Sequence, residues 1–321
     1  MRAIQVSEHG GPEVLRSAEV PDPPVQPGGL LVETQAIGIN FIDTYIRTGI
    51  YAQDVPYVPG SEGSGVVTAV GPGVDEFAVG DRVAWAAAPG SYAEKVSVPA
   101  AVAVPVPAAV EPAVAASALL QGMTAHYLVE SIYQPEPGES VLVHAGAGGV
   151  GLILTQLAAA RGVRVITTVS TDEKEALSRE AGAAEVLRYG GDLASRVREL
   201  TDGVGVAAVY DGVGKTTFDA SLDSLRVRGM LALFGAASGP VPPVDPQRLN
   251  GGGSLFLTRP KLADYTRDRA ELRRRAGDIF EAIAAGKLRV RVGAEYPLAE
   301  AQRAHRDLEG RHTTGSIVLL P

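Results

Sequence analysis

The segment HAGAGGVG (144–151) carries the spacing G-x-G-x-x-G through Gly146, Gly148 and Gly151. It follows a short apolar run, SVLVHA, and opens a run typical of a helix, LILTQLAAARG. Glycines at this spacing allow a tight turn and a close backbone approach to a pyrophosphate, while the helix N-terminus offers unpaired N–H groups and positive dipole charge. Glycine-rich turns are common, but between a strand and a helix this one predicts a dinucleotide-binding loop.

The residues after the next strand indicate which dinucleotide binds. Enzymes that use NAD usually place an acidic residue about twenty positions beyond the loop, where it binds the ribose 2′-hydroxyl. Ser170 stands there instead, and Thr171 and Lys174 could hydrogen-bond and neutralise a 2′-phosphate. Asp172 and Glu173 would instead favour NAD, although acids in the first turn of a helix are also explained by the helix dipole. Lys174 could likewise be an ordinary exposed lysine. The sequence favours NADPH.

A second polar segment, GINFIDTYIRTGIY (38–51), follows a predicted strand and gathers Asn40, Asp43, Tyr45 and Tyr51. Either tyrosine could donate a hydrogen bond to a developing oxyanion and flank a flat ring. Equally, Asp43 could cap a short helix while the tyrosines pack in the core. Both interpretations stay open on the sequence alone.

Groups that would activate an unreactive carbonyl are missing from the sequence. There is no cysteine, which excludes cysteine-ligated zinc and thiolate nucleophiles, and there is no Tyr-x-x-x-Lys pair. The histidines are dispersed without ligand spacing, at positions 9, 126, 144, 305 and 312. A nicotinamide site without a Lewis acid or a strong general acid suits an acceptor that is already electrophilic, such as a quinone or a conjugated carbonyl. We infer a reductase of activated acceptors.

Alternating strands and helices of about ten residues surround the glycine loop. This rhythm begins near residue 120 and predicts βαβ units in a parallel, doubly wound sheet. The expected strands are 140–145, 163–169, 184–189, 206–211, 230–235 and 254–259, and the helices between them are 152–162, 172–182, 192–203 and 215–229.

The two ends of the chain show other patterns. Short β runs at 30–40, 65–70 and 81–87, broken by Gly and Pro, predict a small barrel or sandwich. The Pro-rich segment 98–112 predicts an extended edge or connector. The last part, with helices at 265–286 and 299–310 and strands at 289–297 and 315–321, lies outside the βαβ rhythm. We expect it to return and complete the first domain.

Composition excludes several classes of protein. The net charge of −8 and the pI of about 5.3 disfavour a dedicated nucleic-acid binder, which needs a clustered basic surface. The one basic cluster, TRDRAELRRRAGD (266–278), has interleaved acids and indicates a solvated helix face. The start, MRAIQVSEHGG, has no apolar region typical of a signal peptide, and no run approaches a membrane span. We expect a cytoplasmic protein.

Several segments in the same order carry a resemblance to a known family. They are GINFIDTYIRTGIY, GMTAHYL (122–128), HAGAGGVGLILTQ, YDGVG (210–214), LFLTRP (255–260) and the tail RHTTGSIVLLP. On these segments the chain resembles, essentially from end to end, the zinc-independent quinone oxidoreductases (the ζ-crystallin branch) of the medium-chain dehydrogenase/reductase superfamily.

The resemblance implies an α/β fold in which a GroES-like β-barrel catalytic domain (1–122 and 260–321) is joined to a doubly wound Rossmann domain (123–259). It also implies NADPH as cofactor, a cleft between the two domains, and a homodimer formed through the edge strands of the Rossmann domains, here SLFLTR. The expected substrate is a quinone or enone, with no membrane partner.

The same resemblance assigns the site residues. The glycine loop would cover the pyrophosphate with Gly146, Ala147, Gly148, Gly149, Val150 and Gly151. The 2′-phosphate would be surrounded by Ser170, Lys174, Tyr189 and Arg311, and the ribose and nicotinamide by Asn40, Thr124, Gly212, Phe234, Gly235 and Ser238. Catalytic or substrate contacts would come from Asn40, Tyr45, Tyr51 and Gln121. Gln121 departs from the pattern, since some relatives have lysine there.

The segment 60–71 departs from the pattern of zinc-containing relatives, which carry G-H-E-x-x-G-x-x-x-x-x-G with the histidine on the metal. Here Ser61 replaces that histidine, while Glu62 and the glycines are kept. We therefore expect a backbone corner without metal, in which Glu62 is structural and Ser61 is inert.

Two alternatives remain beside the quinone reductase. An alkenal or enoyl-thioester double-bond reductase would use the same scaffold and NADPH, but a thioester carrier would favour a basic channel, and the N-terminal half has no basic cluster. A structural or RNA-binding role, known for vertebrate relatives, is disfavoured by the acidic charge.

Overall fold

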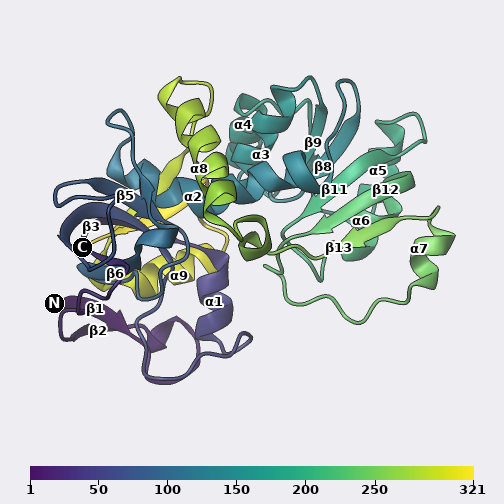
Figure 1. The fold of residues 1–321 in the computed structure, drawn as a ribbon. Helices are drawn as coiled ribbons and strands as arrows, with labels where there is room; N and C mark the ends of the chain where they lie inside the picture. Colours follow the sequence, from purple (N-terminus) through teal and green to yellow (C-terminus); the bar gives the residue numbers. More distant parts are fainter. The chain divides into compact units, whose positions relative to one another are not determined.

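The computed structural model describes all 321 residues, and two units separate in it. The first unit contains Met1–Gln121 and Thr266–Pro321, and the second contains Gly122–Tyr265. The chain therefore leaves the first unit once and returns to it (Figure 1). The family resemblance implied domain boundaries after residues 122 and 259.

A seven-stranded sheet forms the first unit. Along the sheet lie β14 (Val292–Pro297), β15 (Ser316–Leu320), β3 (Gly29–Ile39), β4 (Glu62–Val70), β5 (Arg82–Trp85) and β7 (Val104–Pro105), and β6 (Lys95–Pro99) also pairs with β3. The C-terminal strand β15 pairs antiparallel with β3, so the tail completes this unit as expected. The Pro-rich segment 98–112 contains the last two residues of β6, a 3-10 helix (Ala100–Val102) and the two-residue edge strand β7, so the extended edge is found only in part of it.

Two apolar clusters lie on the long strand β3. Leu30 and Val32 pack with residues that include Val83 and Trp85. Ile37 and Ile39, further along the strand, belong to a second cluster with Ile317. Burying such side chains stabilises each by about 1.5–3 kcal/mol relative to exposure, so the packing holds the end of β3, from which Asn40 follows, in a fixed position.

The first unit also contains a small sheet and three α-helices. A two-stranded sheet joins β1 (Arg2–Gln5) and β2 (Arg16–Glu19), and the helices are α1 (Phe41–Arg47), α8 (Arg269–Ala284) and α9 (Ala301–Glu309). A further helix, α2 (Pro112–Tyr127), contains the boundary between the units in the sequence. The sequence analysis assigned no element to α2, because an Ala-rich run buried on most sides lacks a clear apolar period.

Six parallel strands form the sheet of the second unit. In spatial order they are β10 (Glu185–Arg188), β9 (Arg164–Val169), β8 (Ser140–Val143), β11 (Val206–Asp211), β12 (Leu225–Leu233) and β13 (Phe256–Thr258). Numbered along the chain this order is 3-2-1-4-5-6, the doubly wound arrangement that the sequence predicted. Ligands of such sheets bind outside the carboxyl ends of the strands, where the order reverses beside β8.

The helices of the second unit are α3 (Gly149–Ala159), α4 (Asp172–Glu180), α5 (Leu193–Glu199), α6 (Phe218–Asp223) and α7 (Gln247–Gly251). The helix expected over 215–229 is wrong in its second half, since α6 ends at Asp223 and β12 already begins at Leu225. Leu225 is buried in the core of the sheet and pairs with Val206 of β11. Pairing with β11 outweighs the local helical pattern of these residues. None of the helices has the length and apolar character needed to cross a membrane.

Candidate functional site

The glycine loop lies between β8 and α3, at the carboxyl edge of the parallel sheet. A Cβ atom on Gly146 would lie 2.5 Å from Cβ of Thr167, and one on Gly151 would lie 2.2 Å from the Ala145 carbonyl oxygen. Both positions therefore exclude any side chain. The first N–H groups of α3 have no partner within the helix, so they can receive a phosphate.

A buried chain of hydrogen bonds holds the strand ends beneath this loop. The Ser221 hydroxyl donates to Oδ2 of Asp211 at 2.7 Å, so its oxygen accepts from Nε2 of His144, at 3.0 Å. Nδ1 of His144 then accepts from the Thr168 hydroxyl at 2.9 Å. Burial lowers the pKa of His144, which keeps the ring neutral, as this chain requires. The ends of β8, β9 and β11 are thus tied together.

The loops after β11 and β12 contact each other closely. A Cβ atom on Gly212 would lie 2.8 Å from the Phe234 ring, and one on Gly235 would lie 2.4 Å from the Gly212 carbonyl oxygen. The Ser238 hydroxyl donates to the Val213 carbonyl at 2.8 Å. The sequence-predicted residues Gly212, Phe234, Gly235 and Ser238 are therefore brought together, and Thr124 is buried elsewhere in the same unit, on α2.

Three of the four predicted 2′-phosphate residues lie at one edge of the sheet. Ser170 follows β9, and Lys174 lies in the first turn of α4, whose N-cap Thr171 accepts from the Lys174 backbone N–H at 3.2 Å. The Tyr189 hydroxyl accepts from the Ala145 backbone N–H at 2.9 Å, which places it against the glycine loop. The fourth, Arg311, belongs to the first unit and follows α9 as an exposed residue.

In the first unit, Asn40 is held by partners at both ends of its amide. Its Nδ2 donates to Oε2 of Glu62 at 2.6 Å, and its Oδ1 accepts from Nε2 of Gln121 at 3.1 Å. Oε1 of Gln121 accepts from the Ser316 hydroxyl at 2.6 Å, while Oε1 of Glu62 accepts from the Leu120 backbone N–H at 2.7 Å. All four side chains are buried, so their orientations are determined by one another.

Glu62 is therefore part of a structural network, as the sequence analysis expected. Its side chain is fully buried, and burial raises its pKa to about 8 despite the hydrogen bonds from Asn40 and Leu120. The preceding corner needs glycine, because Gly60 has φ +85° and a Cβ atom there would lie 2.2 Å from the Tyr92 ring. Nowhere are three or more His, Cys, Asp or Glu side chains arranged to hold a metal ion.

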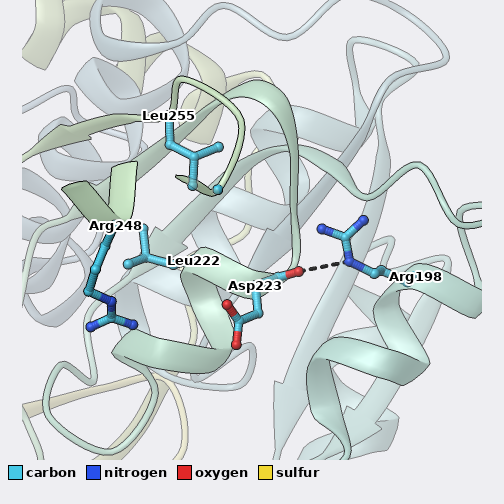
Figure 2. Close-up of a pocket in the computed structure, with 6 residues that line it drawn as sticks. Arg198, Leu222, Asp223, Arg248 and Leu255 are labelled. Atoms are coloured by element: carbon cyan, nitrogen blue, oxygen red, sulfur yellow. Dashed lines mark hydrogen bonds between the residues drawn. The ribbon is translucent and has the colours of Figure 1, made fainter. Parts of the chain in front are cut away.

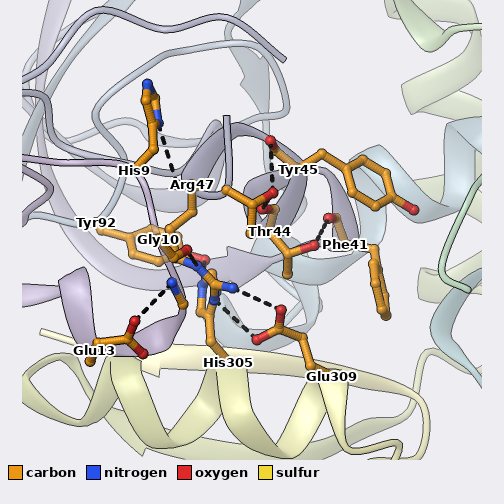
Figure 3. Close-up of polar contacts among 12 residues, drawn as sticks. His9, Gly10, Glu13, Phe41, Thr44, Tyr45, Arg47, Tyr92, His305 and Glu309 are labelled. Carbon is orange, nitrogen blue, oxygen red and sulfur yellow. Dashed lines mark hydrogen bonds and ion pairs between the residues drawn. The ribbon is translucent and has the colours of Figure 1, made fainter. Parts of the chain in front are cut away.

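Helix α1 carries Tyr45 and is anchored by the buried Arg47, which forms an ion pair with α9 (Figure 3). Nη2 of Arg47 lies 2.7 Å from Oε1 of Glu309 on α9, and Nη1 donates to Nδ1 of His305 at 2.9 Å. Nε2 of His305 lies 3.0 Å from the Tyr92 hydroxyl, which donates to Oδ2 of Asp43 at 2.9 Å. Burial and the neighbouring Arg47 lower the pKa of His305 to about 3, so this ring is neutral.

Asp43 is the N3 residue of a capping box at the start of α1, so the capping half of the second interpretation is confirmed, but its other half, tyrosines packed in the core, is wrong for Tyr51. Oδ2 of Asp43 accepts from the Asn40 backbone N–H at 2.9 Å, and burial raises the pKa of Asp43 to about 6. The tyrosines are not core residues: Tyr51 is 42% exposed, and its ring lies 5.7 Å from that of Tyr45 in an edge-to-face arrangement. The Tyr45 ring points away from Arg47 (Figure 3). The two rings thus form an accessible aromatic pair.

A pocket of about 290 Å³ in the second unit does not belong to this site. It is lined by Arg198, Leu222, Asp223, Arg248, Gly252 and Leu255 (Figure 2). These residues come from helix ends and turns that precede β11, β12 and β13, so they lie toward the amino ends of the strands. Nε of Arg198 donates to the Asp223 carbonyl at 2.9 Å, which indicates a role in joining α5 to α6.

Sequence reasoning missed the partners that hold the predicted residues. Tyr92, His305, Glu309 and Ser316 were not singled out, because they act across the fold on residues distant in the chain. Ser316 could have been noted as a polar residue in the apolar strand β15, but nothing in the local pattern identifies its partner.

Comparison with known proteins gives matches along the whole chain. The alcohol dehydrogenase GroES-like domain matches residues 26–108, and the family described as zinc-binding dehydrogenase matches residues 149–265. The chain is 45% identical to the quinone oxidoreductase of Pseudomonas aeruginosa, covering 100% of this chain and 99% of that protein.

Two solved structures extend the comparison. A mycobacterial protein solved in complex with NADPH is 60% identical, with a TM-score of 0.98 over 100% of both chains. The quinone oxidoreductase of Escherichia coli, also solved with NADPH, is 43% identical, with a TM-score of 0.97 over 100% of both chains.

Proposed function

The chain belongs to the zinc-independent quinone oxidoreductases of the medium-chain dehydrogenase/reductase superfamily, and we propose how its residues carry out the reaction of this family. It is an NADPH-dependent enzyme that transfers reducing equivalents to a quinone or another activated conjugated carbonyl. It combines a GroES-like domain with a Rossmann-type nucleotide-binding domain. The observation that supports the proposal is a glycine loop with no room for side chains, at the carboxyl edge of a parallel sheet with the strand order 3-2-1-4-5-6. It occurs in a chain that is similar from end to end to quinone oxidoreductases.

The residues present fit NADPH. When bound, the cofactor supplies a hydride from its reduced nicotinamide. Gly146 and Gly151 allow the loop to pack tightly against Thr167 and Ala145, and the N-terminus of α3 offers N–H donors to the pyrophosphate. The remaining cofactor contacts are proposed as Ala147, Gly149, Val150, Gly212, Phe234, Gly235, Ser238 and Thr124 in the second unit and Asn40 and Arg311 in the first.

The 2′-phosphate is assigned to Ser170, Lys174 and Tyr189 as a proposal. Ser170 and Lys174 offer a hydroxyl and a positive charge beside the N-terminus of α4, where the helix dipole also favours an anion. Tyr189 presents its ring at the glycine loop, 37% exposed. No acidic residue stands at Ser170, where an enzyme specific for NAD would bind the 2′-hydroxyl.

Asn40 and the tyrosines are proposed to handle the acceptor. The Asn40 amide is held rigid by Glu62 and Gln121, so it can orient a bound group without losing its own geometry. Gln121 uses both ends of its amide on Asn40 and Ser316, which favours a positioning role over direct contact with the acceptor. The paired rings of Tyr45 and Tyr51 offer an apolar face and hydroxyl donors to a flat quinone.

Tyr51→Phe is expected to slow quinone turnover roughly tenfold while leaving the Kd of NADPH within about twofold of the wild type. The substitution keeps the ring contact with Tyr45 and removes only the hydroxyl that would donate to the developing quinol oxygen. Steady-state kinetics and NADPH fluorescence titration measure the two quantities, with Tyr57→Phe, whose half-buried ring packs against the cluster of Ile37, Ile39 and Ile317, as a control for loss of a tyrosine hydroxyl. An unchanged rate would remove Tyr51 from the mechanism.

The reaction itself is tested by following NADPH oxidation against quinones, alkenals and enoyl thioesters. We expect the highest kcat/KM with quinones, because quinones need neither metal nor strong acid to accept a hydride. A preference of more than about tenfold for enoyl thioesters would instead favour the double-bond reductase as the main activity.

We propose further that two copies associate through β13. This strand is the edge of the six-stranded sheet and pairs only with β12, and Phe256 on it is 55% exposed. Val227, 67% exposed, adds apolar surface on β12. An unpaired edge with apolar side chains favours pairing with a second copy. Light scattering should give about twice the 33.3 kDa of one chain, and Phe256→Glu should give a monomer; a monomeric wild type would refute this.

A further inference from the structure

We propose that Arg188 is a specificity-determining residue for NADPH, because its guanidinium engages two carboxylates and the N-cap of the turn that would carry the 2′-phosphate. The inference rests on the assignment of the 2′-phosphate to Ser170, Lys174 and Tyr189 made above. It concerns a residue that stands beside this set and that sequence reasoning did not single out.

The sheet register places Arg188 at the proposed phosphate position. β10 pairs in parallel with β9, and the Cα of Arg188 lies opposite that of Val169. The next residue on each strand, Tyr189 and Ser170, therefore leaves the sheet at the same edge. Arg188 is the last residue of β10, so its side chain begins at the point where both proposed phosphate ligands emerge.

One guanidinium joins three parts of the turn. Nη2 of Arg188 lies 2.5 Å from Oδ1 of Asp172 and 2.8 Å from Oε2 of Glu175, and Nη1 donates to the Thr171 carbonyl. Thr171 is the N-cap of α4, and its hydroxyl accepts from the Lys174 backbone N–H. Arg188 thus holds the cap from which Lys174 projects, and it does so through the planar fork that arginine alone provides.

The charges of this turn explain why such a contact is needed. The first turn of α4 carries Asp172, Glu173 and Glu175 beside the single Lys174. A phosphate ester carries nearly two negative charges at neutral pH and would be repelled by these acids. Arg188 pairs with Asp172 and Glu175, which lowers the negative potential at the turn where the 2′-phosphate would bind. Asp172, one of the two acids that counted against NADPH in the sequence, is thereby compensated.

The test compares 2′,5′-ADP with 5′-AMP as probes, by calorimetric titration of the full-length protein. Arg188→Gln is expected to weaken 2′,5′-ADP binding roughly five- to tenfold and to leave 5′-AMP binding within about twofold. The difference should shrink when the salt concentration is raised, because screening acts on charges exposed to solvent. Arg188→Lys, which keeps the charge but loses the fork, should weaken 2′,5′-ADP binding by a smaller factor.

Two further variants distinguish compensation of the acids by Arg188 from direct binding of the phosphate by Arg188. Arg179→Gln removes an arginine that lies 2.9 Å from the other oxygen of Glu175 but makes no contact with Thr171 or Asp172, and it should change 2′,5′-ADP binding less than about twofold. In a protein that already carries Asp172→Asn and Glu175→Gln, the further change Arg188→Gln should alter the affinity for 2′,5′-ADP by less than about twofold. If Arg188→Gln still weakened 2′,5′-ADP binding roughly five- to tenfold in that protein, the proposal would be overturned, since Arg188 would then bind the phosphate itself.

Other outcomes are equally decisive. Equal weakening of 2′,5′-ADP and 5′-AMP by Arg188→Gln would show a general structural role and overturn the proposal. If the wild type bound the two probes equally, the assignment of the 2′-phosphate site would fail instead, and this outcome is seen before any variant is made.

Discussion

The Glu62→Gln variant is expected to gain stability relative to the wild type as the pH rises from about 4.5 to about 8. In the folded protein the Glu62 carboxyl is fully buried, and burial raises its pKa from 4.5 to about 8. The folded state therefore binds a proton that the unfolded state has released over this range. Its stabilising contribution is complete below pH 4.5 and is lost as the pH approaches 8, whereas glutamine does not titrate.

The expected size follows from the same linkage. Each pH unit in this window changes the difference in unfolding free energy by about 1.4 kcal/mol, which amounts to a few kcal/mol in total. Urea unfolding at pH 5, 6, 7 and 8 measures the difference, with the exposed Glu8→Gln as a control that should show a flat difference. A flat difference for Glu62→Gln as well would mean that Glu62 is ionised in the folded protein. Burial raises the pKa of Asp43 to about 6, so this group titrates in the same range. It does so in both the wild type and the variant, and its contribution therefore cancels from the difference in unfolding free energy.

This prediction also concerns the site, because Glu62 holds the amide of Asn40. Nδ2 of Asn40 donates to Oε2 of Glu62 at 2.6 Å, and glutamine can keep only one of the two acceptor positions that Asn40 and Leu120 use. We therefore expect the variant to bind NADPH but to show a lower kcat. Loss of the amide's fixed orientation is the reason.

Lys174→Ala is expected to weaken NADPH binding at least tenfold while leaving NADH binding nearly unchanged. The lysine lies in the first turn of α4, and in the proposed assignment it would supply the positive charge for a phosphate at that helix end. A tenfold loss corresponds to about 1.4 kcal/mol, which is within the range of one charge-assisted hydrogen bond. Titration of cofactor fluorescence in the wild type and the variant gives both dissociation constants.

The control for this experiment is Lys261→Ala, which removes an exposed lysine of the second unit that pairs with Asp264. It should change neither constant. Equal affinities of the wild type for NADPH and NADH, or an equal loss of both in Lys174→Ala, would contradict the assignment of the 2′-phosphate to this turn.

The order and type of most elements follow from local sequence patterns. The strand over 206–211 was predicted with its observed bounds, and the glycine loop was placed between a strand and a helix. These features depend on local patterns: the period of apolar residues, and glycines where neighbouring atoms leave no room for Cβ. The helix over 215–229 failed where pairing with β11 decided the outcome, because local pattern does not include the energy of a partner strand.

The partners that hold the candidate residues come from distant parts of the chain. Glu62 meets Asn40 across 22 positions, and Arg47 meets His305 across 258. Arg188 reaches Asp172 across 16 positions because two parallel strands lie side by side. A buried polar group requires a partner, but which partner is near depends on how the sheet and helices pack. Residue types therefore predicted the chemistry, and long-range packing determined the pKa values and orientations with which it is performed.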